Sequence, residues 1–206
     1  MSKSLIGKKL GMTQVFSESG ESVPVTVIEA GPCVVTQVKT EEKDGYSAVQ
    51  LAYGEVKPNK INKPQKGIFE KLGVKPKKHI KEFRNLNFEN VEPGDKLTVD
   101  QFEAGDLVNV SGISKGKGFA GNVKRHNHAT GPKTHGSRAY RIPGSIGATD
   151  ASRVFKGQKL PGRMGHDQVQ MENLQIVKVM KEDNVLLVKG SIPGPKKGII
   201  TIESVD

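Results

Sequence analysis

The segment from residue 111 to residue 166 constrains this chain most, because its charge is almost entirely of one sign. It contains eleven Lys and Arg residues against one acid, Asp150, together with eleven of the 24 glycines. Its apolar residues repeat with neither the period of a strand nor that of a helix. Such a segment cannot bury enough apolar surface to offset its ordering entropy. We therefore expect it to be irregular or mobile alone and to become ordered against a partner.

The rest of the chain is neutral, with 21 basic and 21 acidic residues, and most of it favours short strands. Turn signals such as Gly31-Pro32 and Pro93-Gly94 separate segments rich in Val, Ile, Thr and Tyr. The predicted strands are 23–28, 33–39, 47–56, 96–99, 107–113, 174–180, 184–189 and 199–204. Many short strands with few helices indicate an antiparallel barrel or sandwich.

Strand-like sequence resumes after residue 166, so the basic segment is predicted to be an excursion from one domain. The predicted body comprises 1–110 plus 167–206, and the predicted extension is 111–166. Within the body, the lysine-rich stretch of about 56–90 is predicted to form a small α+β insert. Its helix is expected at Gln65–Leu72, because Pro64 suits a helix start and Gly73 suits a left-handed cap.

Several features limit where such a chain can act. Cys33 is the only cysteine, so no intrachain disulfide is possible, a reducing compartment is expected, and the residue is predicted to be a small buried hydrophobe. Residues 1–16 hold three lysines and no uninterrupted apolar run, so no signal peptide is predicted. No apolar run approaches the ~20 residues of a membrane span. We expect a soluble, cytoplasmic protein.

Two catalytic templates occur by spacing alone. Residues 116–121 fit G-x-G-x-x-G, but a dinucleotide site needs a helix there and an acid about 20 residues on, and no acid precedes Asp150. Residues 112–116 fit G-x-S-x-G around Ser114, with Asp150 and His166 following in hydrolase order. A nucleophile elbow needs a following helix, whereas more glycine follows Ser114. A serine hydrolase is therefore kept only as a rival hypothesis.

Histidines in the basic segment offer a possible metal site, since His126, His128 and His135 lie close in sequence. Carboxylates that would orient such ligands are scarce, and eleven positive charges would repel a cation. We expect these histidines to face the partner of the basic segment and predict no metal or cofactor.

The net charge of +10 and the pI of about 9.6 point to a polyanionic partner, nucleic acid before an anionic membrane. A charge run is usually a solvated face, but such a face normally mixes both signs. Phe119, Tyr140 and Phe155 interleave with the cations and are suited to stacking on bases or ribose. Glycines without Cβ atoms let phosphates approach backbone N–H groups.

Sequence motifs along the chain indicate more closely which kind of nucleic acid is the partner. Nine positions share the spacing of a known signature: Phe102, Asn109, Gly112, Ser114, Gly116, Lys117, Gly118, Gly121 and Arg125. Residues 7–14, 143–147, 154–157 and 162–166 match further parts of the same pattern. In all of these the chain resembles the L-three family of large-subunit ribosomal proteins, bacterial type.

This resemblance implies a mainly β fold: a six-stranded Greek-key barrel of the translation-protein type with a small α+β insert and a long irregular basic extension. It implies a non-enzymatic constituent of the cytoplasmic ribosome that binds large-subunit rRNA and neighbouring ribosomal proteins, with no membrane or small-molecule partner. It further implies a role in early subunit assembly and an extension that reaches towards the peptidyl transferase centre. Some bacterial members carry a methylated glutamine near the tip, where this chain has 148–151 Ala-Thr-Asp-Ala.

The predicted site residues follow from these arguments together. The predicted rRNA-binding side chains are Lys8, Lys9, Lys115, Lys117, Lys124, Arg125, His126, His128, Lys133, Arg138, Arg141, Arg153, Lys156, Lys159 and Arg163. Close backbone approach is predicted at Gly116, Gly118, Gly121, Gly144 and Gly147, and the predicted tip comprises Ser145, Ala148, Thr149 and Asp150. The alternatives are a free RNA-binding translation or assembly factor, and the hydrolase that would use Ser114.

Overall fold

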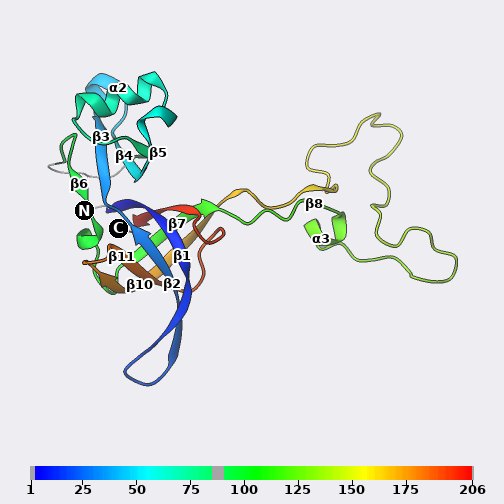
Figure 1. The fold of residues 1–206 in the computed structure, drawn as a ribbon. Helices are drawn as coiled ribbons and strands as arrows, with labels where there is room; N and C mark the ends of the chain where they lie inside the picture. The colour runs from blue at the N-terminus through cyan, green and yellow to red at the C-terminus, as the bar shows by residue number, and fades with distance from the viewer. Residues whose placement is uncertain (1–2, 85–90, 206) are drawn as a thin grey trace. The chain divides into compact units, whose positions relative to one another are not determined.

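The computed structural model describes residues 3–84 and 91–205. The chain divides into two compact units (Figure 1). The first comprises Met1–Ile113 and Gln168–Asp206, and the second comprises Ser114–Asp167. No helix in the described ranges is long and apolar enough to cross a membrane.

A closed antiparallel barrel forms the centre of the first unit. Its strands are β1 (Ser4–Phe16), β2 (Ser22–Ala30), β7 (Leu107–Ile113), β10 (Gln168–Met180), β11 (Val185–Lys189) and β12 (Ile199–Ser204). They are hydrogen-bonded in the order β1-β12-β7-β10-β11-β2, and β2 closes the barrel onto β1. The C-terminal strand β12 thus lies between β1 and β7, which is a Greek-key crossover. The predicted mainly β, six-stranded barrel is confirmed.

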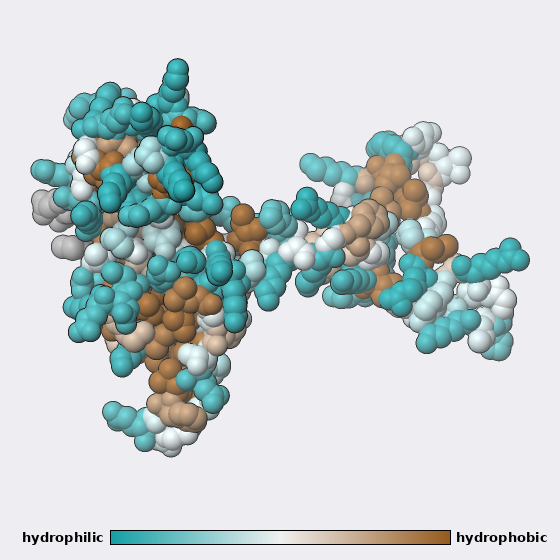
Figure 2. All heavy atoms as spheres, viewed as in Figure 1, coloured by the Kyte–Doolittle hydropathy of each residue, from teal (hydrophilic) through white to brown (hydrophobic). Residues whose placement is uncertain are grey.

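A second sheet carries the insert, in the order β5 (Lys77–Arg84), β4 (Ala48–Glu55), β3 (Cys33–Lys39) and β6 (Lys96–Leu97). Helices α1 (Glu41–Asp44), η1 (Pro58–Lys60) and α2 (Lys63–Lys71) accompany it, and η2 (Val99–Gln101) follows. In the view of Figure 2, hydrophilic side chains cover most of the lobe around α2. The insert therefore spans β3 to β6, wider than the predicted 56–90, of which 85–90 lie outside the described residues.

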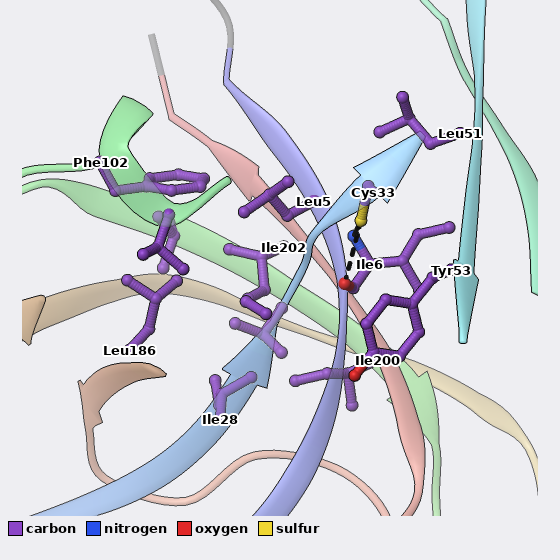
Figure 3. Close-up of a cluster of buried hydrophobic side chains, with 14 of the residues drawn as sticks. Leu5, Ile6, Ile28, Cys33, Leu51, Tyr53, Phe102, Leu186, Ile200 and Ile202 are labelled. Atoms are coloured by element: carbon purple, nitrogen blue, oxygen red, sulfur yellow. Dashed lines mark hydrogen bonds between the residues drawn. The ribbon is translucent and has the colours of Figure 1, made fainter. Parts of the chain in front are cut away.

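One hydrophobic core joins the barrel and the insert sheet (Figure 3). Ile200 and Ile202 alternate along β12, and Ile202 pairs with Val110 of β7, so the inward faces of the two strands coincide. Cys33 begins β3 and is fully buried, as predicted, and its thiol contacts the backbone of Ile6. Burial raises the pKa of this thiol to about 11, because the thiolate would be desolvated there.

Strand β1 was not predicted, because Gly7, Lys8, Lys9 and Gly11 interrupt its apolar alternation. The barrel requires glycine at position 7: an added Cβ would lie 2.9 Å from the carbonyl oxygen of Glu29 on β2. A register shift between Lys9 and Gly11 marks a bulge in the same strand. Local sequence therefore conceals a 13-residue strand that pairs with two neighbours.

The second unit contains little regular structure. It has one short strand pair, β8 (Phe119–Ala120) with β9 (Gly162–Arg163), and one short helix, α3 (Asn122–His126). Turns and irregular backbone make up the remainder. The irregular basic extension predicted from composition is confirmed, although α3 and the strand pair were not foreseen.

Candidate nucleic-acid interface

The outgoing and returning limbs of the second unit are joined by backbone hydrogen bonds near residues 114–118 and 162–167. The N–H of Ser114 donates to the oxygen of Asp167 at 2.9 Å, and the N–H of Lys117 donates to the oxygen of Met164 at 2.9 Å. The N–H of Met164 in turn donates to the oxygen of Gly118 at 2.9 Å. We call this hydrogen-bonded region the limb junction. It gives the excursion a defined start and end.

Gly165 allows the two limbs to approach this closely. Its φ is +72°, and a Cβ on it would lie 2.2 Å from the carbonyl oxygen of Lys115. No side chain fits there without moving the opposite backbone. In the sequence Gly165 stands out only as part of the motif at 162–166, because nothing local indicates that Lys115 lies beside it.

Helix α3 holds the returning limb through three side chains. The Asn122 amide donates to the oxygen of Lys159 at 2.9 Å, and the Arg125 guanidinium donates to the oxygen of Leu160 at 2.9 Å. Nε2 of His126 lies 3.1 Å from the same Leu160 oxygen. Arg125 and His126, both predicted to bind RNA, thus also position the backbone of their own unit.

The cations of the second unit are all exposed and none forms an ion pair with an acid in the described part of the chain. They are Lys115, Lys117, Lys124, Arg125, Lys133, Arg138, Arg141, Arg153, Lys156, Lys159 and Arg163. The only acids of this unit are Asp150 and Asp167. With eleven cations and two anions, the positive potential is not cancelled from within, so it attracts polyanions.

Aromatic rings lie beside several of these cations. The ammonium of Lys133 and the guanidinium of Arg141 lie 5.6 and 5.7 Å from the ring centroid of Tyr140. The guanidinium of Arg153 lies 5.0 Å from the centroid of Phe155. Phe119 is 79% exposed, and no cation of the described residues lies over its ring. These surfaces combine a charge for phosphate with a flat face for a base or ribose.

The predicted glycines mostly face open space. A Cβ at Gly118, Gly121 or Gly144 would meet no described heavy atom within 4 Å. At Gly116 and Gly147 the nearest atom would lie at 3.7 Å, an ordinary contact. The fold of the isolated chain therefore leaves the space beside these glycines available to a partner.

The predicted tip is a series of small, exposed turns. The Ser145 hydroxyl donates to the oxygen of Gly147 at 3.1 Å, and the N–H of Ser152 donates to the oxygen of Thr149 at 3.1 Å. Ala148, Thr149 and Asp150 are all exposed. His128 is also exposed, with its ring centroid 5.8 Å from that of His126.

Two predicted RNA contacts, Lys8 and Lys9, lie on β1 of the first unit. Lys8 is partly exposed and forms an ion pair of 3.4 Å with Glu29. Lys9 is 8% exposed, and its ammonium donates to the oxygens of Ile192 at 2.8 Å and Gly194 at 3.3 Å. Lys9 thus fixes the loop before β12.

The geometry does not match the catalytic templates. Residues 114–118 are irregular, and the first helix after Ser114 is the five-residue α3, whereas both templates require a helix at the glycine turn. The Ser114 hydroxyl accepts a hydrogen bond from the N–H of Asp167 at 3.2 Å, which gives it a structural role at the limb junction. Among the described residues, no three His, Cys, Asp or Glu side chains cluster in a way that could hold a metal ion.

Comparisons with known proteins agree with this picture. The family model described as ribosomal protein L3 matches residues 68–185. The chain is 60% identical to large ribosomal subunit protein uL3 of Natranaerobius thermophilus, over 98% of this chain and 96% of that protein. It is 56% identical to the uL3 of Halalkalibacterium halodurans, over 99% and 98% of the two chains. Similarity of this extent shows that the chain belongs to the ribosomal protein L3 family of the large ribosomal subunit.

Proposed function

We propose that this chain is a structural, non-catalytic constituent of the large ribosomal subunit that binds large-subunit rRNA through residues 114–167. One observation carries the proposal: every Lys and Arg of this unit is exposed and without an acidic partner in the described residues. Eleven such charges on a segment with few apolar contacts are costly to keep together unless a polyanion neutralises them.

The proposed mechanism is charge neutralisation with close backbone approach. Lys and Arg side chains displace condensed counterions from rRNA phosphates, which supplies a large, salt-dependent part of the binding free energy. The open positions at Gly121 and Gly144 allow phosphate or ribose to approach the backbone. Tyr140 and Phe155, already flanked by cations, offer faces for stacking.

We further propose that the turns at 145–153 act near the peptidyl transferase centre. We also propose that the protein takes part in early subunit assembly and contacts neighbouring ribosomal proteins in the cytoplasmic ribosome. Support comes from the family and from the small, exposed residues of the tip, which suit a narrow space between RNA strands. We expect Ala148→Trp or Asp150→Lys to alter sensitivity to peptidyl-transferase-site antibiotics more than Lys43→Ala on α1. Equal effects from all three variants would argue against this location of the tip.

The binding proposal is tested by salt dependence. If about six to eight of the eleven cations contact phosphate, the extension contributes roughly −4 to −7 to the slope of log K against log salt. Replacing Lys133, Arg138, Arg141, Arg153, Lys156 and Lys159 by Gln removes about half of these cations and should then reduce the magnitude of the slope by roughly 2 to 4. An unchanged slope would refute RNA binding by the extension.

Two further experiments separate the rival functions. A free translation factor dissociates from the large subunit during sedimentation in high-salt sucrose, whereas a resident constituent remains bound. A serine hydrolase would react at Ser114 with a fluorophosphonate probe, and we expect no labelling of that residue.

A further inference from the structure

A second concentration of positive charge lies in the insert. Residues 57–84 contain ten Lys and Arg residues and two acids, a net charge of +8. Outside this stretch and residues 111–166, the chain has 11 basic and 19 acidic residues, a net charge of −8. The apparent neutrality of the body is therefore an average of a cationic insert and an acidic remainder.

Helix α2 turns its lysines away from the core. At 100° per residue, Phe69, which is buried, and Ile68, which is half-buried, lie on one side of α2. Lys63 lies on the opposite side, Lys66 and Lys71 lie at the two edges of the buried side, and all three are exposed. The lobe that carries α2 presents mainly hydrophilic atoms in Figure 2.

Internal partners account for only some of the ten cations. Lys66 pairs with Glu70 at 3.3 Å, and Lys77 pairs with Glu55 at 3.8 Å. The ammonium of Lys81 donates to the Thr201 hydroxyl at 3.0 Å, and Arg84 lies over the ring of Tyr46.

The other six lysines are exposed and form no ion pair with an acid of residues 3–84 or 91–205. They are Lys57, Lys60, Lys63, Lys71, Lys75 and Lys78, which we call the insert surface. A face kept only for solubility would mix both signs, yet these six lysines within 57–78 are accompanied by a single acid, Glu70. That acid already pairs with Lys66.

The type of cation differs between the two basic regions. Five of the six arginines lie in residues 111–166. The sixth, Arg84, lies in the insert over the ring of Tyr46, and the other nine cations of residues 57–84 are lysines. Arginine offers a planar fork that contacts bases and phosphates with defined geometry and stacks on rings. Lysine is a flexible point charge, suited to phosphates irrespective of the base sequence.

From charge, exposure and residue type together, we propose that the insert surface is a second RNA-binding site, which contacts the phosphate backbone without reading sequence. The proposal rests on the proposed function, since it takes the polyanion to be rRNA. It adds a separate surface on a folded body. Lys63 and Lys71 belong to α2, Lys60 to η1 and Lys78 to β5, while Lys57 and Lys75 lie in connecting segments.

The test uses the full chain with matched charge changes. One variant carries Lys63→Gln, Lys71→Gln and Lys75→Gln on the insert surface. The control carries Lys43→Gln in α1, Lys178→Gln in β10 and Lys189→Gln in β11. These three lysines are also exposed and form no ion pair in the described residues. Both lower the net charge by three. Each is titrated with a large-subunit rRNA transcript and with a shuffled transcript of equal length and composition, at several salt concentrations.

The insert variant should reduce the magnitude of the salt slope by roughly 2 to 3, equally for both transcripts, if each lysine neutralises one phosphate. The control should change the slope by less than about 1. Equal effects from the two variants, or none from the insert variant, would overturn the proposal. An effect on the rRNA transcript alone would overturn its sequence independence. Unchanged thermal unfolding of both variants verifies that the body remains folded.

The outcome is independent of the extension. If neutralising the six extension cations leaves RNA affinity unchanged while the insert variant weakens it, the proposed function of the extension fails and the insert surface stands. If the extension variant weakens binding and the insert variant does not, only the insert surface is refuted.

Discussion

Replacing Gly165 by alanine should break the limb junction of the extension. A Cβ there would lie 2.2 Å from the Lys115 oxygen, far inside ordinary contact, and the backbone has a φ of +72°. Left-handed backbone costs a non-glycine residue about 1–2 kcal/mol. Relieving the clash requires separating limbs joined by three backbone hydrogen bonds, each with a net value of about 0.5–1.5 kcal/mol. If one or two of these bonds are lost together with the backbone strain, the limb junction should lose about 2–4 kcal/mol of local stability.

Amide hydrogen exchange measures this loss directly. The N–H groups of Lys117 and Met164 close the limb junction, so their protection should fall by roughly 30-fold to 1,000-fold in Gly165→Ala. Gly144→Ala is the matched control, since its Cβ would meet no described atom within 4 Å. The thermal stability of the barrel should not change. Unchanged protection at Lys117 and Met164, or an equal loss in the control, would refute the reasoning.

Three further predictions concern the body and the loop. Lys9→Met should lower the free energy of unfolding by about 2–4 kcal/mol in chemical denaturation, because two charge-assisted hydrogen bonds to backbone oxygens are lost. The control Lys8→Met removes only a partly exposed ion pair and should lower it by less than about 1 kcal/mol. From pH 9 to 11 the unfolded Cys33 thiol ionises, whereas the folded thiol, with its pKa raised to about 11, ionises only towards the upper end of that interval. The wild type should therefore lose about 2 kcal/mol more than Cys33→Ala over that interval, and parallel curves would contradict this. Limited trypsin should cut first between Lys133 and Lys159, where irregular backbone carries exposed cations, and first cleavage within 20–55 would contradict that assignment.

The sequence predicts which residues form a strand wherever buried side chains alternate along it. It does not predict which other strands that strand pairs with. The alternation of Val108 and Val110, and of Ile200 and Ile202, indicates a buried face directly. The same kind of pattern at 33–39 and 48–55 produced strands of the insert sheet instead of the barrel. Nothing local distinguishes the two, because a strand's sheet is decided by distant contacts.

The helix of the insert was located almost correctly, at Lys63–Lys71 against the predicted Gln65–Leu72. Pro64 and Gly73 supply local signals for its two ends. Strand β1 escaped prediction because its glycines and lysines interrupt the apolar alternation, and the groups that stabilise the buried Lys9 are distant in sequence. Its ammonium bonds to the oxygens of Ile192 and Gly194, more than 180 positions away.

For the candidate site, the composition of the sequence locates the basic segment, whereas the roles of its individual side chains become visible only from contacts in the structure. Eleven cations against one acid predict exposure, because no internal partner exists to bury them, and exposure is what the structure has. That Arg125 and His126 would also hold the Leu160 oxygen depends on a contact across 35 and 34 positions, which local sequence does not indicate. Their contacts with RNA remain predictions.

The distribution of order within the extension bears on how the proposed binding would work. Backbone hydrogen bonds and the side chains of α3 join the outgoing limb to residues 159–167 of the returning limb. Residues 127–158 between them rely on short turns and single contacts such as that between Gly131 and Tyr140. Fixing the backbone costs about 1–2 kcal/mol per residue, and these few contacts offset only a small part of that. Phosphate contacts must therefore supply the remainder when RNA binds. The limb junction is ordered before RNA binds and holds the two ends of the irregular stretch in place. It therefore reduces the conformational entropy that this stretch loses on binding. On this argument the limb junction contributes to RNA affinity although its backbone groups need not touch RNA.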